Sequence, residues 1–158
     1  MSIRSTANAI IVYDSKVLLV KCHHKEHGYF YVLPGGGQNT YEPFLDALIR
    51  ECLEETGYTV KPVRFAALCE QIWTNPAMRE QHPDSTHSMR HYFICELTGN
   101  DSTEPTEKDD MQVGVEWVPL DDLSSVVFFN KTIGDNLYDI IYGNAPLFLG
   151  TEYCDLVI

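Results

Sequence analysis

Positive charge is scarce in this sequence. Its 158 residues include 11 Lys plus Arg against 23 Asp plus Glu, which gives a formal net charge of −12. Because such a surface repels nucleic-acid phosphates, binding to duplex DNA or RNA is not expected. A divalent cation would offset that repulsion for a smaller phosphate compound, since carboxylates and phosphate oxygens both bind such ions. The alternative is that the acidic surface only keeps the protein soluble.

Long apolar runs and paired cysteine motifs are also missing. No stretch approaches the roughly 20 apolar residues of a membrane helix, and the first apolar run, Ala9–Tyr13, is too short for a signal peptide. The five cysteines form no Cys-x-x-Cys motif, and Cys52, Cys69 and Cys95 lie among apolar residues as buried free thiols do. We therefore expect a cytoplasmic protein in a reducing compartment, with no membrane partner.

The length and an ordinary composition, 44% hydrophobic and 22% charged, predict one domain over residues 1–158. Strands are expected at Ala9–Tyr13, Lys16–Lys21, Tyr29–Leu33, Val60–Trp73, His91–Thr98 and Val113–Val118, and helices at Pro43–Thr56, Pro119–Phe129 and Lys131–Tyr142. Asp14–Ser15 is expected to be a tight turn, and the glycines after Pro34 to break regular structure. Thr74–Ser88 and Gly99–Asp110 are expected to be loops, and the tail after Pro146 is left unassigned. Without a regular βαβ alternation, the fold class is α+β, a mixed sheet flanked by helices.

The segment from Gly35 to Tyr58 is the most informative part of the sequence. It contains five acids and one arginine, which are Glu42, Asp46, Glu51, Glu54, Glu55 and Arg50. In the expected helix, Glu51, Glu54 and Glu55 are spaced i, i+3 and i+4, so their carboxylates share one side. Like charges at this spacing destabilise a helix, whereas a hard divalent cation would turn their repulsion into binding. A solvated acidic face is the alternative interpretation of these three residues alone.

The surroundings of these carboxylates resemble the Nudix box, which reads glycine, five residues, glutamate, seven residues and then Arg-Glu-x-x-Glu-Glu-x-Gly. All seven fixed positions match, at Gly36, Glu42, Arg50, Glu51, Glu54, Glu55 and Gly57. A chance match in a chain of this length is rarer than roughly one in a million at ordinary residue frequencies. The lead-in Leu33–Gly36 and the later Glu116–Leu120 also resemble the family, less specifically. Tyr41, Cys52 and Tyr58 depart from the family pattern but remove no metal ligand.

The resemblance implies a Nudix fold, with a mixed β-sheet sandwiched between α-helices, and a pyrophosphohydrolase that uses Mg²⁺ or Mn²⁺. It assigns the catalytic metal ions to Glu51, Glu54 and Glu55. The backbone carbonyl of Gly35 is expected to join these ligands, and Arg50 to orient the glutamates. Bound metal ions would polarise a phosphoryl oxygen and activate the attacking water.

The family frequently adds one acid from outside the box, as a ligand or a general base. The candidates in this chain are Glu107, Asp109, Asp110 and Glu116. Each is also explained as a solvated acid. The resemblance further raises a homodimer as one option for the assembly.

Substrate-binding residues have to be sought outside the box. Tyr29 and Tyr31 share one face of an expected strand and could stack on a base, with core packing as the alternative. Arg64 and Arg90 are among the few positive charges and could hold a phosphate, although a surface role is the alternative for each. The three histidines at 23, 24 and 27 lack the cysteines or second cluster of a metal site, so a polar loop is the better interpretation.

We therefore predict a metal-dependent hydrolase that cleaves a diphosphate linkage in a nucleoside diphosphate derivative. A house-cleaning nucleoside triphosphate pyrophosphatase is the alternative within the same class. A Nudix-like sensor that binds a nucleotide without cleaving it is the alternative outside that class. An isomerase acting on a prenyl diphosphate would need a catalytic cysteine outside the box, and none can be assigned.

Overall fold

The structure is a computed structural model that describes residues 3–99, 101–106 and 110–155. Eight strands occur in these ranges, β1 (Arg4–Tyr13), β2 (Lys16–His24), β3 (Gly28–Val32), β4 (Gly35–Gly37), β5 (Val60–Trp73), β6 (His87–Leu97), β7 (Gln112–Pro119) and β8 (Leu147–Cys154). The helices are α1 (Phe44–Thr56), α2 (Pro76–Gln81), the 3₁₀ helix η1 (Leu120–Ser125) and α3 (Lys131–Tyr142).

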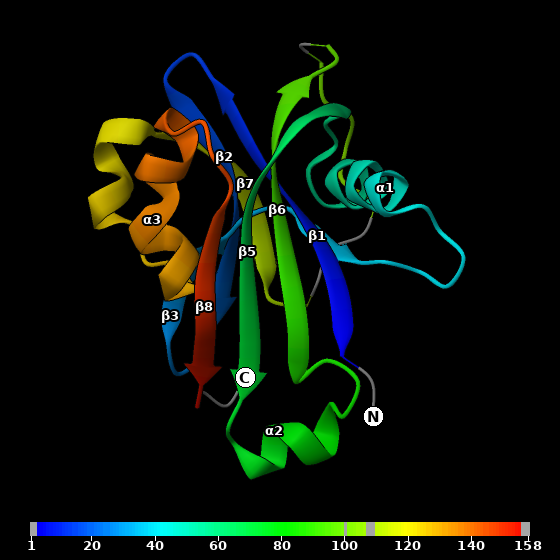
Figure 1. The fold of residues 1–158 in the computed structure, drawn as a ribbon. Coiled ribbons are helices and arrows are strands. Elements are labelled where there is room, and N and C mark those ends of the chain that lie inside the picture. The colour runs from blue at the N-terminus through cyan, green and yellow to red at the C-terminus, as the bar shows by residue number, and fades with distance from the viewer. Residues whose placement is uncertain (1–2, 100, 107–109, 156–158) are drawn as a thin grey trace.

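The strands form a mixed sheet with helices on both sides. β4, β1, β6, β5 and β8 lie side by side in that order, and β2 pairs with β1, β3 and β7. The β1–β6 and β5–β8 pairs are parallel, and the other pairs are antiparallel. Figure 1 shows α1 and α3 on opposite sides of these strands, with α2 at one end. The predicted mixed sheet between helices is therefore confirmed.

The turn between β1 and β2 follows from its two residues. Asp14 and Ser15 both adopt positive φ, at 49° and 57°. Two successive left-handed residues match the twist of antiparallel strands, and aspartate is among the residues that tolerate this conformation. The tight turn predicted at these positions is confirmed, and it sets β1 antiparallel to β2.

The box helix α1 is held by one apolar face. Leu48 and Cys52 are fully buried against Ala7 and Ile11 of β1, as the i, i+4 spacing predicts. Leu45, which the i, i+3 spacing places on the same side of the helix as Leu48, is 44% exposed. The helix ends at Gly57, whose left-handed φ of 75° lets its amide donate to the Leu53 carbonyl.

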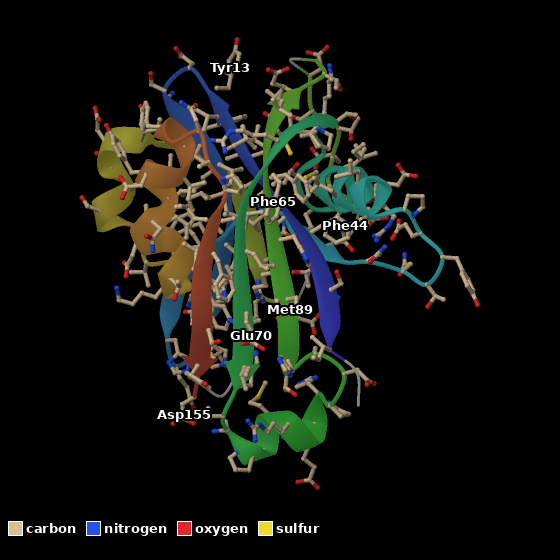
Figure 2. The ribbon with its side chains drawn as sticks, in the orientation of Figure 1. Tyr13, Phe44, Phe65, Glu70, Met89 and Asp155 are labelled. Carbon is tan, nitrogen blue, oxygen red and sulfur yellow. The ribbon has the colours of Figure 1, made fainter. Side chains whose placement is uncertain are left out.

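The start of α1 also contacts the sheet. Phe44 of the helix and Phe65 of β5 both pack against the Phe93 ring of β6, at centroid distances of 5.9 and 5.4 Å (Figure 2). Because these contacts lie at one end of α1 and Cys52 lies near the other, the helix axis is fixed at two points along the sheet.

Two expectations about irregular segments were wrong. The glycines at 35 to 37 form the short strand β4 and pair with Thr6, Ala7 and Asn8 of β1, because glycine permits this close backbone approach. The segment Thr74–Ser88 is not all loop, since Asn75 caps α2 by accepting from the amides of Ala77 and Met78.

Two C-terminal elements also differ from expectation. The predicted helix Pro119–Phe129 is reduced to η1, and its last residues run beside β3, where Tyr31 exchanges backbone hydrogen bonds with Val127 and Phe129. The tail after Pro146, to which the sequence assigns no element, forms β8, which pairs with β5 in parallel. Both segments satisfy their backbone groups through distant strands, which a local pattern does not reveal.

The core lies between the sheet and its helices. Ile133, Leu137 and Ile140 of α3 are buried there, with Ile10 of β1 and Leu19 of β2 among their neighbours. All five cysteines are buried, and Cys52, Cys69 and Cys95 are free thiols, which confirms the expectation for these three. Across the described ranges, no helix combines the length and apolarity that crossing a membrane would require.

We predict that Leu137→Ala lowers the free energy of unfolding by about 2–5 kcal/mol, because Leu137 is fully buried and its removal leaves a cavity. Urea unfolding monitored by circular dichroism measures the change. Asp139→Ala, at an exposed position of the same helix, is the matched control and should change stability by no more than about 0.5 kcal/mol. Equal losses in the two variants would contradict the placement of α3.

Candidate active site

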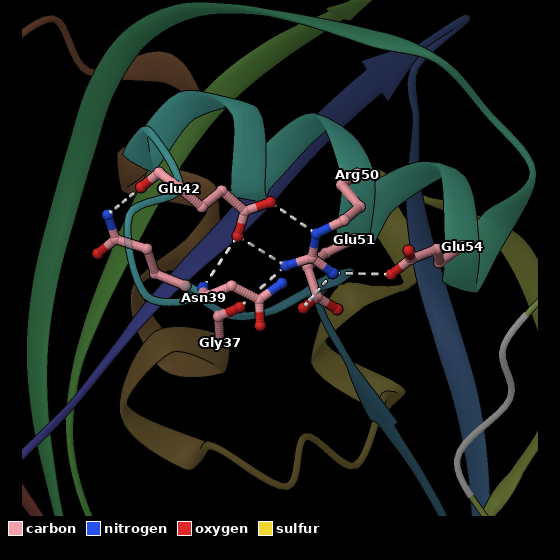
Figure 3. A network of polar contacts seen from close by, with 7 residues as sticks. Gly37, Asn39, Glu42, Arg50, Glu51 and Glu54 are labelled. Atoms are coloured by element: carbon pink, nitrogen blue, oxygen red, sulfur yellow. Dashed lines mark hydrogen bonds and ion pairs between the residues drawn. The ribbon is translucent and has the colours of Figure 1, made fainter.

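A single guanidinium organises the charged side of α1. Arg50 donates from Nε and Nη2 to the two carboxylate oxygens of Glu42, at 2.7 and 3.0 Å. Its Nη1 donates to Glu51 at 2.9 Å and to Glu54 at 2.8 Å. Its Nη2 also reaches the carbonyl oxygen of Gly37 at 3.0 Å. Figure 3 shows the guanidinium lying between the helix and the loop before it. Arg50 therefore orients two glutamates and fixes the loop to the helix.

The electrostatic environments of these carboxylates differ. Hydrogen bonds from Arg50 and from the Asn39 amide lower the pKa of Glu42 from 4.5 to about 2. Burial raises the pKa of Glu51, whose side chain is 17% exposed, and the Arg50 guanidinium opposes that shift. Glu42 is thus held as a firm anion for Arg50, while Glu51 is a partly desolvated carboxylate that would gain from a further positive charge.

The glycines of β4 allow the loop to lie directly against the glutamates. The Gly35 amide donates to Glu55 Oε2 at 2.9 Å. A Cβ at Gly36 would collide with the Glu51 carboxylate, and one at Gly35, where φ is 139°, would collide with the Ala7 carbonyl. Because side chains are excluded at both positions, the backbone of this strand lies next to two box carboxylates.

The donor set fits a hard divalent cation. Glu51 and Glu55 place carboxylate oxygens beside backbone groups of β4, and oxygen ligands are what Mg²⁺ and Mn²⁺ prefer. Glu51 and Glu54 both accept from one nitrogen of Arg50, so they already lie within reach of one positive charge. In the part of the chain that the structure describes, no three acidic, histidine or cysteine side chains are gathered as a preformed metal centre. A cation would compete with Arg50 and the Gly35 amide for these oxygens.

The two tyrosines proposed for substrate binding lie on β3 beside a charged pair. Tyr31 donates from its hydroxyl to Glu116 at 2.7 Å, and Lys21 forms an ion pair with Glu116 at 2.7 Å. Lys21, and then Tyr31, lower the pKa of Glu116. Tyr29 is 60% exposed and packs on the ring of His23. The exposed Tyr29 ring also has the Lys21 ammonium over it, 5.2 Å from the ring centroid, whereas Tyr31 joins β3 to β7.

The two candidate arginines are both hydrogen-bonded within the fold. Arg64 donates from Nη2 to the carbonyls of Ile140 and Gly143, where it satisfies the C-terminus of α3. Arg90 donates to side-chain oxygens of Gln71 and Asn130. Neither is joined to the box by a described hydrogen bond, and whether either contacts substrate stays a prediction.

The acids outside the box fall into two groups. Glu116 is engaged with Lys21 and Tyr31, away from the described contacts of α1. Asp110 is exposed and lies in the loop before β7, and both sides of that loop are attached to α1. The Thr106 amide donates to the Glu54 carbonyl, and Gln112 Nε2 donates to the Glu55 carbonyl. Glu107 and Asp109 lie outside the described residues.

Sequence reasoning missed two residues that support the site. Gln112 is buried and docks on the C-terminal end of α1. Arg4 of β1 lies where a Cβ of Gly37 would be, and its charge opposes the rise that burial causes in the pKa of Glu51. No sequence signal identifies either residue, because strand pairing alone brings β1 and β7 to the box.

A separate hollow lies away from the box. A cavity of about 870 Å³ between η1 and α3 is lined by residues such as Leu120, Val126, Phe128 and Tyr138. It includes no box residue, so it is not part of the candidate site.

We predict that the Glu42–Arg50 pair makes stability depend on acid pH. Because folding lowers the pKa of Glu42, the pair stabilises the native state fully above about pH 4.5 and loses this effect as pH falls toward about 2. The difference in unfolding free energy between the wild type and Glu42→Gln should therefore be largest near neutral pH and shrink on acidification. Urea titrations across this range measure it, and a difference that grows at low pH would contradict the pairing.

The chain resembles known proteins in sequence. The sequence model of the NUDIX domain matches residues 3–137. A curated Caenorhabditis elegans protein that bears a nudix hydrolase name is 29% identical over 112 residues, which cover 71% of this chain and 27% of that protein. The chain thus spans about a quarter of the length of this relative.

Solved structures share the fold. A Nudix hydrolase from Nitrosomonas europaea has a TM-score of 0.68 at 21% identity, covering 87% of this chain and 88% of its own. An ADP-ribose pyrophosphatase from Streptococcus suis has a TM-score of 0.63 at 19% identity, covering 96% and 100%. A UDP-X diphosphatase has a TM-score of 0.66 at 18% identity, covering 96% and 68%. Since the family match extends over most of the sequence, and the same residues build the Arg50 network, the chain belongs to the NUDIX domain family.

Proposed function

We propose that this protein hydrolyses a diphosphate linkage in a nucleoside diphosphate derivative, with Mg²⁺ or Mn²⁺ as cofactor. The observation that carries the proposal is the arrangement of three glutamates on one side of α1, with Glu51 and Glu55 against the side-chain-free strand β4 and Glu54 joined to Glu51 through Arg50. Because the chain is acidic, a cation beside these carboxylates is needed to offset their repulsion of a diphosphate.

The three glutamates would hold the metal, together with the carbonyl of Gly35. When bound, the cation supplies a Lewis acid for a phosphoryl oxygen and lowers the pKa of a water molecule. Glu51 would gain from this charge, because burial raises its pKa and so disfavours its ionised form. Glu55 is held by the Gly35 amide, which keeps its carboxylate at the loop.

Arg50 would act as a positioning residue. Its fork holds Glu51 and Glu54 on one side and the Glu42 carboxylate on the other. A planar guanidinium does this better than a lysine, because several N–H groups donate in fixed directions. The orientation of two of the three proposed metal ligands therefore rests on one side chain.

We assign the acid outside the box to Asp110 rather than Glu116. Asp110 is exposed in a loop that is attached at Thr106 and Gln112 to carbonyls of α1. Glu116 already accepts from Lys21 and Tyr31, and these contacts lower its pKa, which makes it a poorer base.

The names of two structural relatives support the proposed substrate class. One is named as an ADP-ribose pyrophosphatase and another as a UDP-X diphosphatase, and both names describe nucleoside diphosphate derivatives. The buried free thiols support a reducing, cytoplasmic setting. A homodimer remains a prediction from the resemblance.

We predict metal-dependent turnover with nucleotide sugars or ADP-ribose in a panel that also includes nucleoside triphosphates and dinucleoside polyphosphates. Glu54→Gln should lower kcat by about 100-fold or more, because it removes a charged ligand that stabilises the transition state. Removal of the metal with a chelator should abolish turnover. Product release, measured by chromatography, is the assay.

The matched control is Glu80→Gln, an exposed glutamate of α2, which should keep wild-type kcat. Turnover confined to nucleoside triphosphates would replace the proposed substrate class by house-cleaning pyrophosphatase activity. Nucleotide binding without turnover in any metal would favour a sensor and contradict the proposal.

We also predict that Asp110→Asn lowers kcat and alters its pH profile, because it removes the proposed base. Glu116→Gln should leave kcat within a few-fold and affect stability instead. Steady-state kinetics between pH 6 and 10 compare the two variants. A selective loss in Glu116→Gln would reverse the assignment.

A further inference from the structure

A polar cluster is buried on the face of the sheet opposite α1. Its members are Gln71 of β5, Ser88 and Arg90 of β6, and Asn130, which precedes α3. Gln71, Ser88 and Asn130 are only 1%, 2% and 5% exposed. Gln71 and Ser88 are cross-strand partners, and so are their neighbours Glu70 and Met89 (Figure 2). Since strand side chains alternate, Gln71 and Ser88 point to the face opposite Glu70 and Met89.

Three polar atoms of this cluster have no hydrogen-bond partner among the described residues. They are Gln71 Nε2, Ser88 Oγ and Asn130 Nδ2. A buried polar atom without a partner destabilises a fold, so such atoms are few in native proteins. Three in one cluster indicate a place where a ligand supplies the missing partners.

Arg90 determines which atom of each amide is left as a hydrogen-bond donor. Its Nε donates to Gln71 Oε1 at 3.1 Å, and its Nη1 donates to Asn130 Oδ1 at 3.2 Å. Because guanidinium groups only donate, the oxygen of each amide must face Arg90. The nitrogen of each amide is thereby presented as a donor on its other side. Asn130 is also the N-cap residue of α3, yet its side chain makes no capping hydrogen bond.

Aromatic rings stand beside the donors. Trp73 lies two residues after Gln71 on the same strand, and Phe129 directly precedes Asn130. Their ring centroids are 5.7 Å apart, and Phe30 lies 5.4 Å from Phe129. Arg90 and Phe129 are only partly buried, so the cluster reaches the surface next to them. Donors beside flat rings suit a planar ligand rich in acceptors.

We propose that this cluster recognises the base of the substrate, and that it selects a base with a ring carbonyl over one with an amino group at the same position. The proposal rests on the proposed function, since it concerns the same nucleotide. Guanine presents O6 and N7 as neighbouring acceptors, and uracil, like thymine, presents O4. Adenine and cytosine place an amino donor there instead. An amino group would face the donors of Gln71 and Asn130 without a partner.

The position of the cluster agrees with this role. Arg90 pairs in register with Thr6 of β1, and Thr6 pairs with Gly37 of β4. Two strand spacings, about 10 Å, thus separate Arg90 from the loop that Arg50 holds. β4 lies at the edge of this group of strands, so phosphates could extend past it toward the box carboxylates.

The experiment is calorimetric titration of the full chain with two pairs of nucleoside monophosphates. Inosine and adenosine monophosphate differ only in a carbonyl or amino group at C6, and uridine and cytidine monophosphate differ in the same way at C4. The carbonyl member of at least one pair should bind at least about tenfold more tightly than its amino partner. These products need no catalysis, so the result is independent of turnover.

Variants test the residues. Gln71→Glu and Asn130→Asp keep the oxygen that faces Arg90 but replace a donor by an acceptor. The affinity of the carbonyl member relative to its amino partner should therefore fall to one or reverse. The added negative charge acts on both members of a pair, so it does not change this ratio. Ser88→Ala should reduce the ratio without changing charge. Asn136→Asp, on α3, is the matched control, because the Asn136 side chain donates to the Thr132 carbonyl and not to a member of the cluster, and it should retain the wild-type ratio.

Equal binding of the members of both pairs, tighter binding of both amino members, or no binding of any monophosphate would overturn the proposal. So would a selectivity that survives Gln71→Glu and Asn130→Asp together. Hydrolysis without base selectivity would leave the proposed function standing and refute this inference. Base selectivity that depends on the cluster, found without any hydrolysis, would support this inference and refute the proposed function.

Discussion

The charged side of this protein depends on the position of one guanidinium. Three carboxylates on one side of α1 repel each other, and two of them are stabilised because Arg50 donates to both. The same guanidinium also holds Glu42 and the Gly37 carbonyl, so it joins the helix to the loop before it. Arg50 therefore offsets the carboxylate repulsion that would destabilise an isolated helix. A cation could bind the same carboxylate oxygens.

The backbone of β4 is the second constraint. Gly35 and Gly36 allow the strand to pair with β1 and to touch Glu55 and Glu51 from the other side. A side chain at either position would separate the loop from the glutamates or from the sheet. The close contact of the β4 backbone thus determines both the edge of the sheet beside β1 and the positions of the Glu51 and Glu55 carboxylates.

The two faces of the sheet have different chemistry. The face under α1 supports the charged network through apolar contacts such as Leu48 with Ala7. The opposite face is apolar near α3 but becomes polar around Gln71, Ser88 and Asn130. Because a nucleotide has an anionic part and a planar polar part, the two proposals together assign metal binding to one face and base recognition to the other.

The family, the box helix and the turn at Asp14–Ser15 are predictable from the amino-acid order, because each depends on residues close together in the chain. Helical spacing predicts that Glu51, Glu54 and Glu55 share one side of α1. In contrast, the strand at Gly35–Gly37, the pairing of β8 with β5 and the support of α1 by Gln112 depend on the three-dimensional fold. It also placed Arg64 at the C-terminus of α3 and joined Arg90 to Gln71 and Asn130. These contacts join distant segments through hydrogen bonds, which leave no periodic pattern in the sequence.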